Sequence, residues 1–179
     1  MNAIVGVDKF WAIGKNGQLL IRSEYDLAHF KEMTVGNVII YGRKTLETFR
    51  DCKPLPNRTN IILTRDPNFA VEGAIIVHDL DELDVKLAEI QAEQPRVQVF
   101  VCGGASIYEQ LLPRCKYAYV THFDAAIEGA DAFFPNLEEL PNWHIDTNYE
   151  PLEVTYKNRK DDSPKMTMRF ATWVNDDVD

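Results

Sequence analysis

A pair of glycines at positions 103 and 104 follows the apolar run 97–101 and precedes a helix-like segment. Glycine lets a backbone approach a ligand closely, and the N–H groups at the start of a helix can bind a phosphate. The pair lacks the G-x-G-x-x-G spacing that is typical of dinucleotide-binding turns. A phosphate site and a purely structural tight turn are therefore both open interpretations of this motif.

A second motif, Gly-Arg-Lys-Thr at positions 42–45, follows the apolar run 37–41. Its two cations and its hydroxyl suit a phosphate, although Lys and Arg after a strand are often only solvated surface residues. Arg65 follows a third apolar run, 60–64. Because ligands of open α/β sheets bind at the carboxyl ends of the strands, we expect these segments to share one ligand-binding edge.

Asp26 is an acid within segment 24–34, which has apolar residues at helical spacing, among them Leu27 and Phe30. Ser23 precedes the segment as a candidate N-cap. Ser23 with Asp26 resembles a capping box, which is the simpler interpretation. The alternative is a lone carboxylate on the Leu27/Phe30 face of the helix, inside a pocket.

Arg58 lies in the proline-rich segment 54–59 (PLPNRT). The prolines stiffen such a loop, so its arginine could pair with a carboxylate through two parallel hydrogen bonds. The alternative is a solvated loop cation. The histidines and cysteines have no spacing typical of metal ligands, so we expect no metal site.

Strand-like and helix-like segments alternate through most of the chain. The expected strands are 2–7, 37–41, 60–64, 74–77, 97–101 and 116–123. Helices are expected over 24–34, after GRKT (42–45) to about Phe49, after a capping box of Asp79 and Glu82, and after the glycine pair. Two β-like pieces, 145–157 and 166–174, flank the polar segment NRKDDSP, which we interpret as a hairpin connection. This pattern predicts an α/β fold with a mostly parallel central sheet, helices on both faces and a C-terminal antiparallel hairpin.

Length and composition limit the alternatives. The 179 residues predict one domain, assigned to 1–174, followed by an acidic tail at 175–179 that we expect to fray. A formal net charge of −9 disfavours nucleic acid and anionic membrane surfaces as partners. Three widely spaced cysteines, the lack of an export signal in MNAIVGVDKF and the lack of a membrane-length apolar run favour a cytoplasmic protein.

Taken together, the motifs resemble the dihydrofolate reductase family over nearly the whole chain. Each motif alone is weak, but their order and spacing are specific. The matching segments are 13–17 (IGKNG), 26–31, 42–45, 54–63, 103–108, 119–122 and 134–135. The resemblance implies a single-domain fold of that family and NADPH-dependent reduction of 7,8-dihydrofolate to tetrahydrofolate. Hydride would pass to pterin C6 and a proton to N5.

The resemblance also implies roles for individual residues. Asp26 would be the single acid of the pterin pocket, with Thr121 supporting it. Substrate would be contacted by Val5, Ile21, Leu27, Phe30, Leu55 and Arg58, the last holding the glutamate α-carboxylate. NADPH would be bound by Gly6, Ile13, Gly14, Gly42, Arg43, Lys44, Thr45, Leu63, Thr64, Arg65, Cys102, Gly103, Gly104, Ala105, Ser106, Ile107 and Tyr108. The expected partners are dihydrofolate and antifolates, and the expected state is a monomer.

Two further expectations follow from the resemblance, together with one departure from it. The Gly103–Gly104 peptide is expected to be cis, and residues 14–23 to form a lid over the nicotinamide. The family commonly reads Gly-x-Leu-Pro-Trp in this lid, whereas residues 17–21 read GQLLI, with Ile21 in place of the tryptophan. The rival interpretations are a pyrimidine reductase of riboflavin synthesis, which Asp26 and Arg58 disfavour, and a catalytically silent nucleotide- or folate-binding protein.

Overall fold

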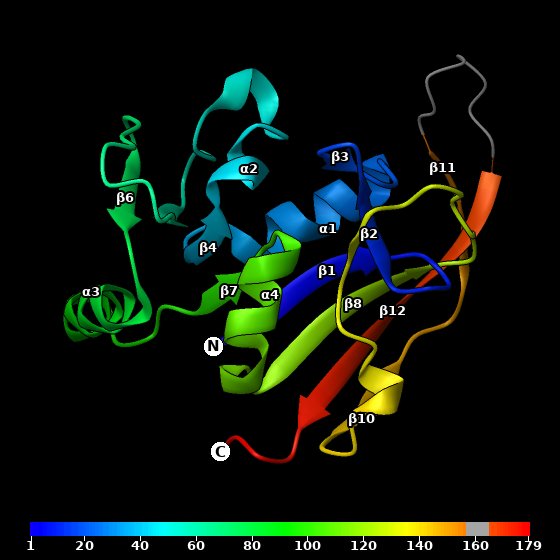
Figure 1. Cartoon of the computed structure of the whole chain (residues 1–179). Coiled ribbons are helices and arrows are strands. Elements are labelled where there is room, and N and C mark those ends of the chain that lie inside the picture. Colours follow the sequence, from blue (N-terminus) through cyan, green and yellow to red (C-terminus); the bar gives the residue numbers. More distant parts are fainter. Residues whose placement is uncertain (157–164) are drawn as a thin grey trace.

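A computed structural model describes residues 1–156 and 165–179, and a twisted, mostly parallel sheet runs through its centre (Figure 1). Within these residues the strand order is β10-β12-β8-β1-β7-β4-β5-β6, and β11 also pairs with β12. The parallel strands are β1 (Asn2–Val7), β4 (Val38–Gly42), β5 (Thr59–Leu63), β6 (Ala74–Val77), β7 (Val99–Val101) and β8 (Tyr117–Phe123). The antiparallel strands are β10 (Trp143–Asn148), β11 (Leu152–Thr155) and β12 (Lys165–Asn175). The predicted fold class is confirmed.

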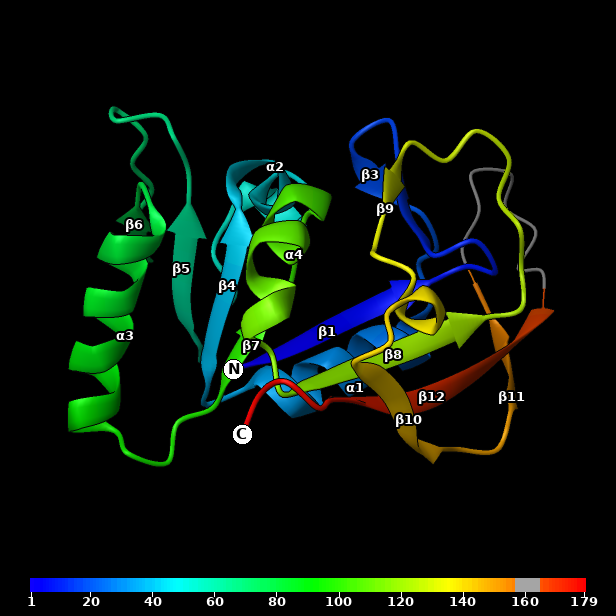
Figure 2. The same ribbon diagram turned by 60° about the horizontal axis from the view of Figure 1, so that its bottom comes forward.

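Helices cover both faces of the sheet, with α3 and α4 in front of it and α1 and α2 behind it in Figure 2. They are α1 (Glu24–Thr34), α2 (Arg43–Leu46), α3 (Leu80–Glu93) and α4 (Ala105–Leu111). Short 3₁₀ turns lie at Arg50–Cys52, Leu112–Arg114 and Leu137–Glu139. A small second sheet of β2 (Ala12–Lys15), β3 (Gln18–Leu19) and β9 (Ala132–Phe133) was not foreseen, because its strands are too short to show alternation.

The alternation of side chains along the central strands creates two cores. One side of the sheet contributes Val38, Ile40 and Val101 to a core shared with α3 and α4. The other side contributes Ile39, Tyr41 and further side chains to a core that Phe30 and Met33 of α1 cover. Strands buried on both faces are apolar throughout, which is why their sequence reads as continuous apolar runs.

Several local expectations need correction. The run 97–101 begins as a strand only at Val99, because the N–H of Val97 closes a turn onto the carbonyl of Gln94. The piece 145–157 is two strands, β10 and β11, interrupted around Pro151, whose ring cannot donate to a sheet. The proposed hairpin connection, NRKDDSP, lies outside the described residues.

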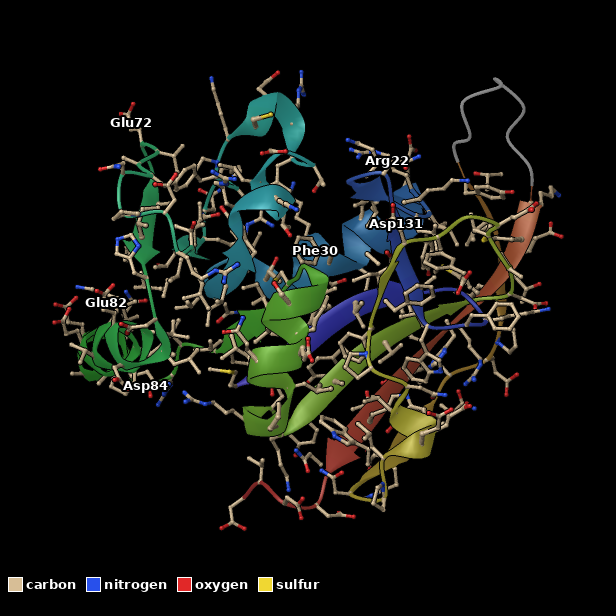
Figure 3. The ribbon with its side chains drawn as sticks, viewed as in Figure 1. Arg22, Phe30, Glu72, Glu82, Asp84 and Asp131 are labelled. Atoms are coloured by element: carbon tan, nitrogen blue, oxygen red, sulfur yellow. The ribbon has the colours of Figure 1, made fainter. Side chains whose placement is uncertain are left out.

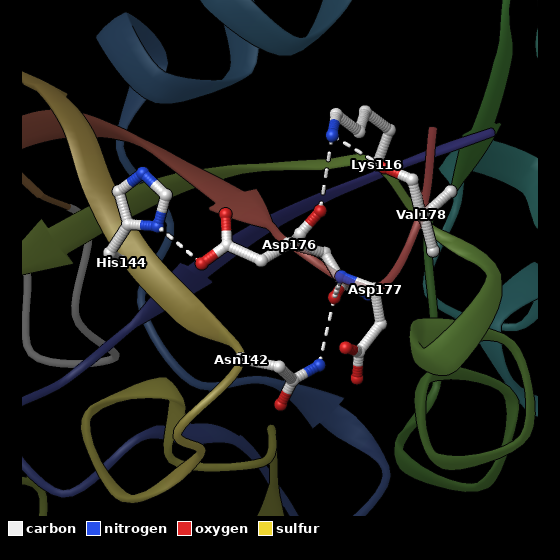
Figure 4. Close-up of polar contacts among 7 residues, drawn as sticks. Lys116, Asn142, His144, Asp176, Asp177 and Val178 are labelled. Atoms are coloured by element: carbon white, nitrogen blue, oxygen red, sulfur yellow. Dashed lines mark hydrogen bonds and ion pairs between the residues drawn. The ribbon is translucent and has the colours of Figure 1, made fainter.

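The expectation of a frayed tail from residue 175 is also corrected. Asn175 is the last residue of β12 and is fully buried, with its amide donating to the carbonyl of Cys115. The Lys116 ammonium donates to the carbonyls of Asn175 and Val178, and His144 pairs with Asp176 at 3.2 Å (Figure 4). These contacts hold the last residues against the end of β8.

Candidate active site

Asp26 does not act as a helix cap. Its Oδ1 accepts a 2.6 Å hydrogen bond from the hydroxyl of Thr121, which lies on β8 and is 3% exposed. Ser23 occupies the N-cap position of α1 but makes no side-chain cap bond, and its buried hydroxyl has no partner within the described residues. The capping-box interpretation is therefore wrong, and the helix directs Asp26 toward the sheet instead.

Glycine at position 6 makes room for this carboxylate. A Cβ atom on Gly6 would lie 3.3 Å from Oδ2 of Asp26 and 2.9 Å from Cε2 of Phe123, which is too close for an unstrained side chain. Burial raises the pKa of Asp26 above its usual 3.8, and the Thr121 hydrogen bond and nearby His29 oppose that shift. The site therefore holds one acid that binds a proton more readily than an ordinary aspartate and keeps a second oxygen for a ligand.

Apolar side chains continue from this acid along the α1 face of the sheet. Phe30 and Leu55 both pack against the core of Ile4, Tyr41 and Phe100, and Phe30 lies at the centre of Figure 3. Leu27 is half-buried on the same helix as Phe30. These side chains provide an apolar surface beside a carboxylate, which suits a flat aromatic ring that carries polar edges.

The side chain of Val5 lies in a different core from Phe30 and Leu55. It belongs to the core on the α4 side of the sheet, together with Ile107 and Tyr108. The Tyr108 hydroxyl donates a 2.7 Å hydrogen bond to the carbonyl of Ile4. Val5 therefore lies with predicted cofactor-binding residues and not with Phe30 and Leu55.

Arg58 is held in a defined orientation. Its Nε donates to the carbonyl of Pro56 at 3.0 Å, and one Nη donates to the hydroxyl of Thr34 at 3.1 Å. The Thr34 hydroxyl in turn donates to the carbonyl of Phe30 at 2.7 Å, at the end of α1. These bonds leave part of the guanidinium for a ligand. Thr34 has no sequence signal that could have revealed this role.

Asn60 organises the loop that carries Arg58. Its Oδ1 accepts bonds from the hydroxyl of Tyr41 and the N–H of Leu55, and its amide donates to the carbonyls of Leu55 and Arg58, all within 2.8–3.0 Å. Asn60 is 3% exposed. An asparagine inside the apolar run 60–64 was the available signal for this role.

The glycine motifs meet at the carboxyl end of the sheet, as predicted. The N–H of Gly42 donates to the carbonyl of Gly103 at 2.8 Å. A Cβ on Gly42 would lie 3.1 Å from Cγ1 of Ile107, and a Cβ on Gly104 would lie 3.6 Å from Oγ1 of Thr45. Gly103 has a φ of 113°, and the Gly103–Gly104 peptide is cis, as expected. Gly103 favours glycine because of its positive φ and Gly42 because of its close packing, whereas a Cβ on Gly104 would make only an ordinary van der Waals contact.

The predicted cations surround this edge. Arg43 is exposed, lies 3.5 Å from Asp66 and sits over the Phe69 ring at 6.0 Å. Lys44 and Arg65 are also exposed. Because all three residues are exposed, they are accessible to an anionic ligand.

Other predicted cofactor residues lie along the same strand ends. Leu63 is buried in the α4-side core, which Ile13 borders, and Cys102 packs at the edge of the core on the α1 side. Gly14 packs closely against Ala132 in the small sheet. Ala105 and Ser106 begin α4, and the carbonyl of Thr64 is 2.9 Å from Nδ1 of His78.

Ile21 packs with the C-terminal strands. It is 5% exposed, in a cluster with Phe123, Val154 and Met168. Phe123 also borders Gly6, next to Asp26. The Phe123 ring therefore lies between Ile21 and the surroundings of Asp26. The expected lid, 14–23, includes the β2–β3 turn, whose Asn16 N–H donates to Asp131 at 2.9 Å; Figure 3 labels Arg22 and Asp131 in this region.

Neither a metal cluster nor a membrane-length helix appears among the described residues. No three histidine, cysteine or acidic side chains gather there in a way that would hold a metal ion. No helix of residues 1–156 or 165–179 combines the length and apolarity that a membrane crossing needs.

Comparison with known proteins agrees with this geometry. A family model described as dihydrofolate reductase matches residues 1–175. The dihydrofolate reductase of Staphylococcus haemolyticus is 40% identical over 135 residues (75% of this chain and 76% of the relative), and that of Bacillus subtilis is 38% identical over 143 residues (79% of each). The structure of the Enterococcus faecalis dihydrofolate reductase, complexed with NADP(H) and RAB-propyl, has a TM-score of 0.73 and 31% identity, covering 97% of this chain and 95% of that one. This chain belongs to the dihydrofolate reductase family.

Proposed function

We propose that this protein catalyses the NADPH-dependent reduction of 7,8-dihydrofolate to 5,6,7,8-tetrahydrofolate, with Asp26 as the acid of the pterin pocket. The observation that carries the proposal is the half-buried Asp26 carboxylate, fixed by Thr121 and left with one oxygen facing Gly6. A carboxylate in this position can accept hydrogen bonds from a ring N–H and an adjacent amino group. Its negative charge stabilises a protonated, electron-poor pterin, which is a better hydride acceptor.

The residues at the glycine edge fit NADPH. Gly42 packs closely against Ile107, and Gly103 has a positive φ that favours glycine, so bare backbone lies at this edge and suits a cradle for a pyrophosphate. Arg43 and Arg65 supply exposed cations for phosphate groups. When bound, NADPH supplies the hydride, and the protein contributes orientation, a proton-binding group and exclusion of water.

The remaining site residues divide the substrate between them. Phe30, Leu55, Leu27 and Ile21 would cover the apolar faces of the pterin and the aminobenzoyl ring. Arg58 would pair with the α-carboxylate of the glutamate tail, because Thr34 and Pro56 already fix its guanidinium. Antifolates that carry a similar flat ring would use the same pocket. We further propose that the protein is a monomer and that it works in the cytoplasm; its three free cysteines support the second of these proposals, because they suit a reducing compartment.

The test is the decrease in absorbance at 340 nm with NADPH and dihydrofolate, compared with NADPH alone. Asp26→Asn should slow single-turnover hydride transfer at neutral pH by roughly 10²-fold or more. A variant that keeps the normal rate would remove Asp26 from the chemistry. Tight folate binding without NADPH oxidation would identify a silent binding protein, and turnover of an aminopyrimidine substrate instead would identify the riboflavin-type reductase.

A further inference from the structure

His29 lies one helical turn after Asp26 on α1. Residues three positions apart share one face of a helix, so the imidazole and the carboxylate project toward the same part of the sheet. The His29 ring lies against the Phe170 ring of β12, with centroids 4.1 Å apart and ring planes at 38°. Tyr25, one turn before His29, stacks on the same Phe170 ring at 6.2 Å. Two ring contacts therefore fix this face of α1 on β12.

The strand that binds Asp26, β8, is the direct neighbour of β12. Phe170 is the direct antiparallel partner of Thr121 in the pairing of β12 with β8, and Thr121 donates the 2.6 Å hydrogen bond to Asp26. Directly paired positions on β8 and β12 thus contact Asp26 and His29 of α1. The fold itself keeps the imidazole close to the carboxylate, so the distance between them does not depend on a freely rotating surface side chain.

We propose that His29 is a positioning residue that tunes the ionisation of Asp26, so that the two groups together set the pH dependence of hydride transfer. This inference rests on the role proposed above for Asp26. His29 need not touch the substrate or the cofactor, since it acts through the charge on its neighbour.

The charges around His29 support this coupling. Asp26 and Glu32, both on α1, act on the imidazole, whereas β12 presents the uncharged Phe170 ring and β8 presents the Thr121 hydroxyl to this corner. Two phenols lie nearby: Tyr25 shares the Phe170 ring with His29, and Tyr108 of α4 interacts with Asp26. Burial lowers the pKa of His29 below 6.5, and the two carboxylates oppose that shift. Reciprocally, His29 lowers the pKa of Asp26 against the effect of burial. The charged form of each group therefore favours the charged form of the other.

The first test measures single-turnover hydride transfer against pH in the full-length protein with NADPH and dihydrofolate. His29→Gln removes the charge, and His29→Phe removes the charge but keeps a ring for Phe170. Without the imidazolium the carboxylate of Asp26 is less favoured, so the apparent pKa of the profile should rise in both variants. A Phe variant with the wild-type profile would mean that His29 only packs, which overturns the inference.

The second test does not depend on catalysis. The pKa of His29 is measured by NMR on the labelled imidazole in the wild type and in Asp26→Asn. It should be lower in Asp26→Asn, because the carboxylate that favours the charged imidazole is gone. Glu32→Gln serves as a control that should also lower the pKa of His29 while leaving the Asp26 carboxylate and its hydrogen bond in place. An unchanged His29 pKa in Asp26→Asn would overturn the inference.

The two proposals fail in different ways. If Asp26→Asn loses activity but the His29 variants keep the wild-type pH profile, the inference about His29 fails and the role of Asp26 stands. If Asp26→Asn keeps the normal hydride-transfer rate, the role of Asp26 fails. The inference about the pH profile then fails with it, whatever the NMR titration shows.

Discussion

The Tyr41 hydroxyl donates a 2.9 Å hydrogen bond to Oδ1 of Asn60, and both side chains are almost completely buried. Asn60 uses both lone-pair directions of its oxygen and both hydrogens of its amide within this corner. Tyr41 on β4 and Asn60 on β5 thereby connect the sheet to the loop that presents Leu55 and Arg58. The position of the proposed carboxylate-binding arginine is thus set from the interior of the protein.

Removing this support should affect both stability and substrate binding. Tyr41→Phe deletes one hydrogen bond and should lower the free energy of unfolding by about 1 kcal/mol. Asn60→Leu leaves the backbone groups of Leu55 and Arg58 without partners, so we expect a loss of roughly 2–4 kcal/mol and a higher KM for dihydrofolate. Urea unfolding and steady-state kinetics measure the two effects. Equal stability losses in the two variants would contradict the central role given to Asn60.

Arg58→Leu should weaken dihydrofolate binding while sparing a pterin that lacks the glutamate tail. The reason is that a charge-assisted pair of hydrogen bonds is stronger than a neutral one, which contributes about 0.5–1.5 kcal/mol. Thr34→Val should produce a smaller change in the same direction, because it frees the guanidinium without removing it. Calorimetric titration with both ligands measures these affinities. Loss of affinity for both ligands would point to collapse of the proline-rich loop.

The cofactor preference should depend on Arg43 and Arg65. NADPH carries a phosphate on the ribose that NADH lacks, and guanidinium groups bind phosphate through paired, charge-assisted hydrogen bonds. NADPH should therefore be preferred over NADH. Replacing both arginines with alanine should raise the KM for NADPH far more than the KM for NADH. Asp66→Asn is a matched control, because it frees Arg43 from its 3.5 Å ion pair without removing a cation. Equal losses for the two cofactors would show that these arginines do not discriminate between them.

His122 should make the protein sensitive to acid. Burial, with a smaller effect of Arg169, lowers the pKa of His122 to about 4. The unfolded chain therefore binds a proton at this residue that the folded chain does not, between about pH 6.5 and about 4, so stability falls as the pH falls through this window. His122→Gln should remove this part of the pH dependence. The unfolding free energy that it no longer loses across the window is roughly 2–3 kcal/mol at most.

Chemical denaturation at several pH values measures this effect. If the unfolding free energy of His122→Gln falls with pH as steeply as that of the wild type, other groups cause the acid sensitivity.

The sequence by itself determined the order of the main strands and helices of the central sheet and the edge at which the two glycine motifs meet. Apolar runs ending in Gly42 and Gly103 predict parallel strands, because such strands are buried on both faces and need continuous apolar residues. The same topology brings the carboxyl ends of those strands to one edge of the sheet, which is why the two glycine motifs could be placed together from the sequence and proposed as a ligand site. Motif order and spacing were also sufficient to indicate the family.

Only the tertiary structure decided between the two interpretations of Asp26. Local spacing favours a cap with Ser23, three residues away, whereas the actual partner, Thr121, is 95 residues away and meets Asp26 because β8 lies beneath α1. Thr34, His29 and Asn60 make their contacts with Arg58, Phe170 and Tyr41 in the same way, through tertiary packing. Helical and strand periodicity depends on residues that are close together in the chain, so it can be recognised from a short segment of sequence. A hydrogen bond between distant segments depends on how those segments pack, which no local pattern records.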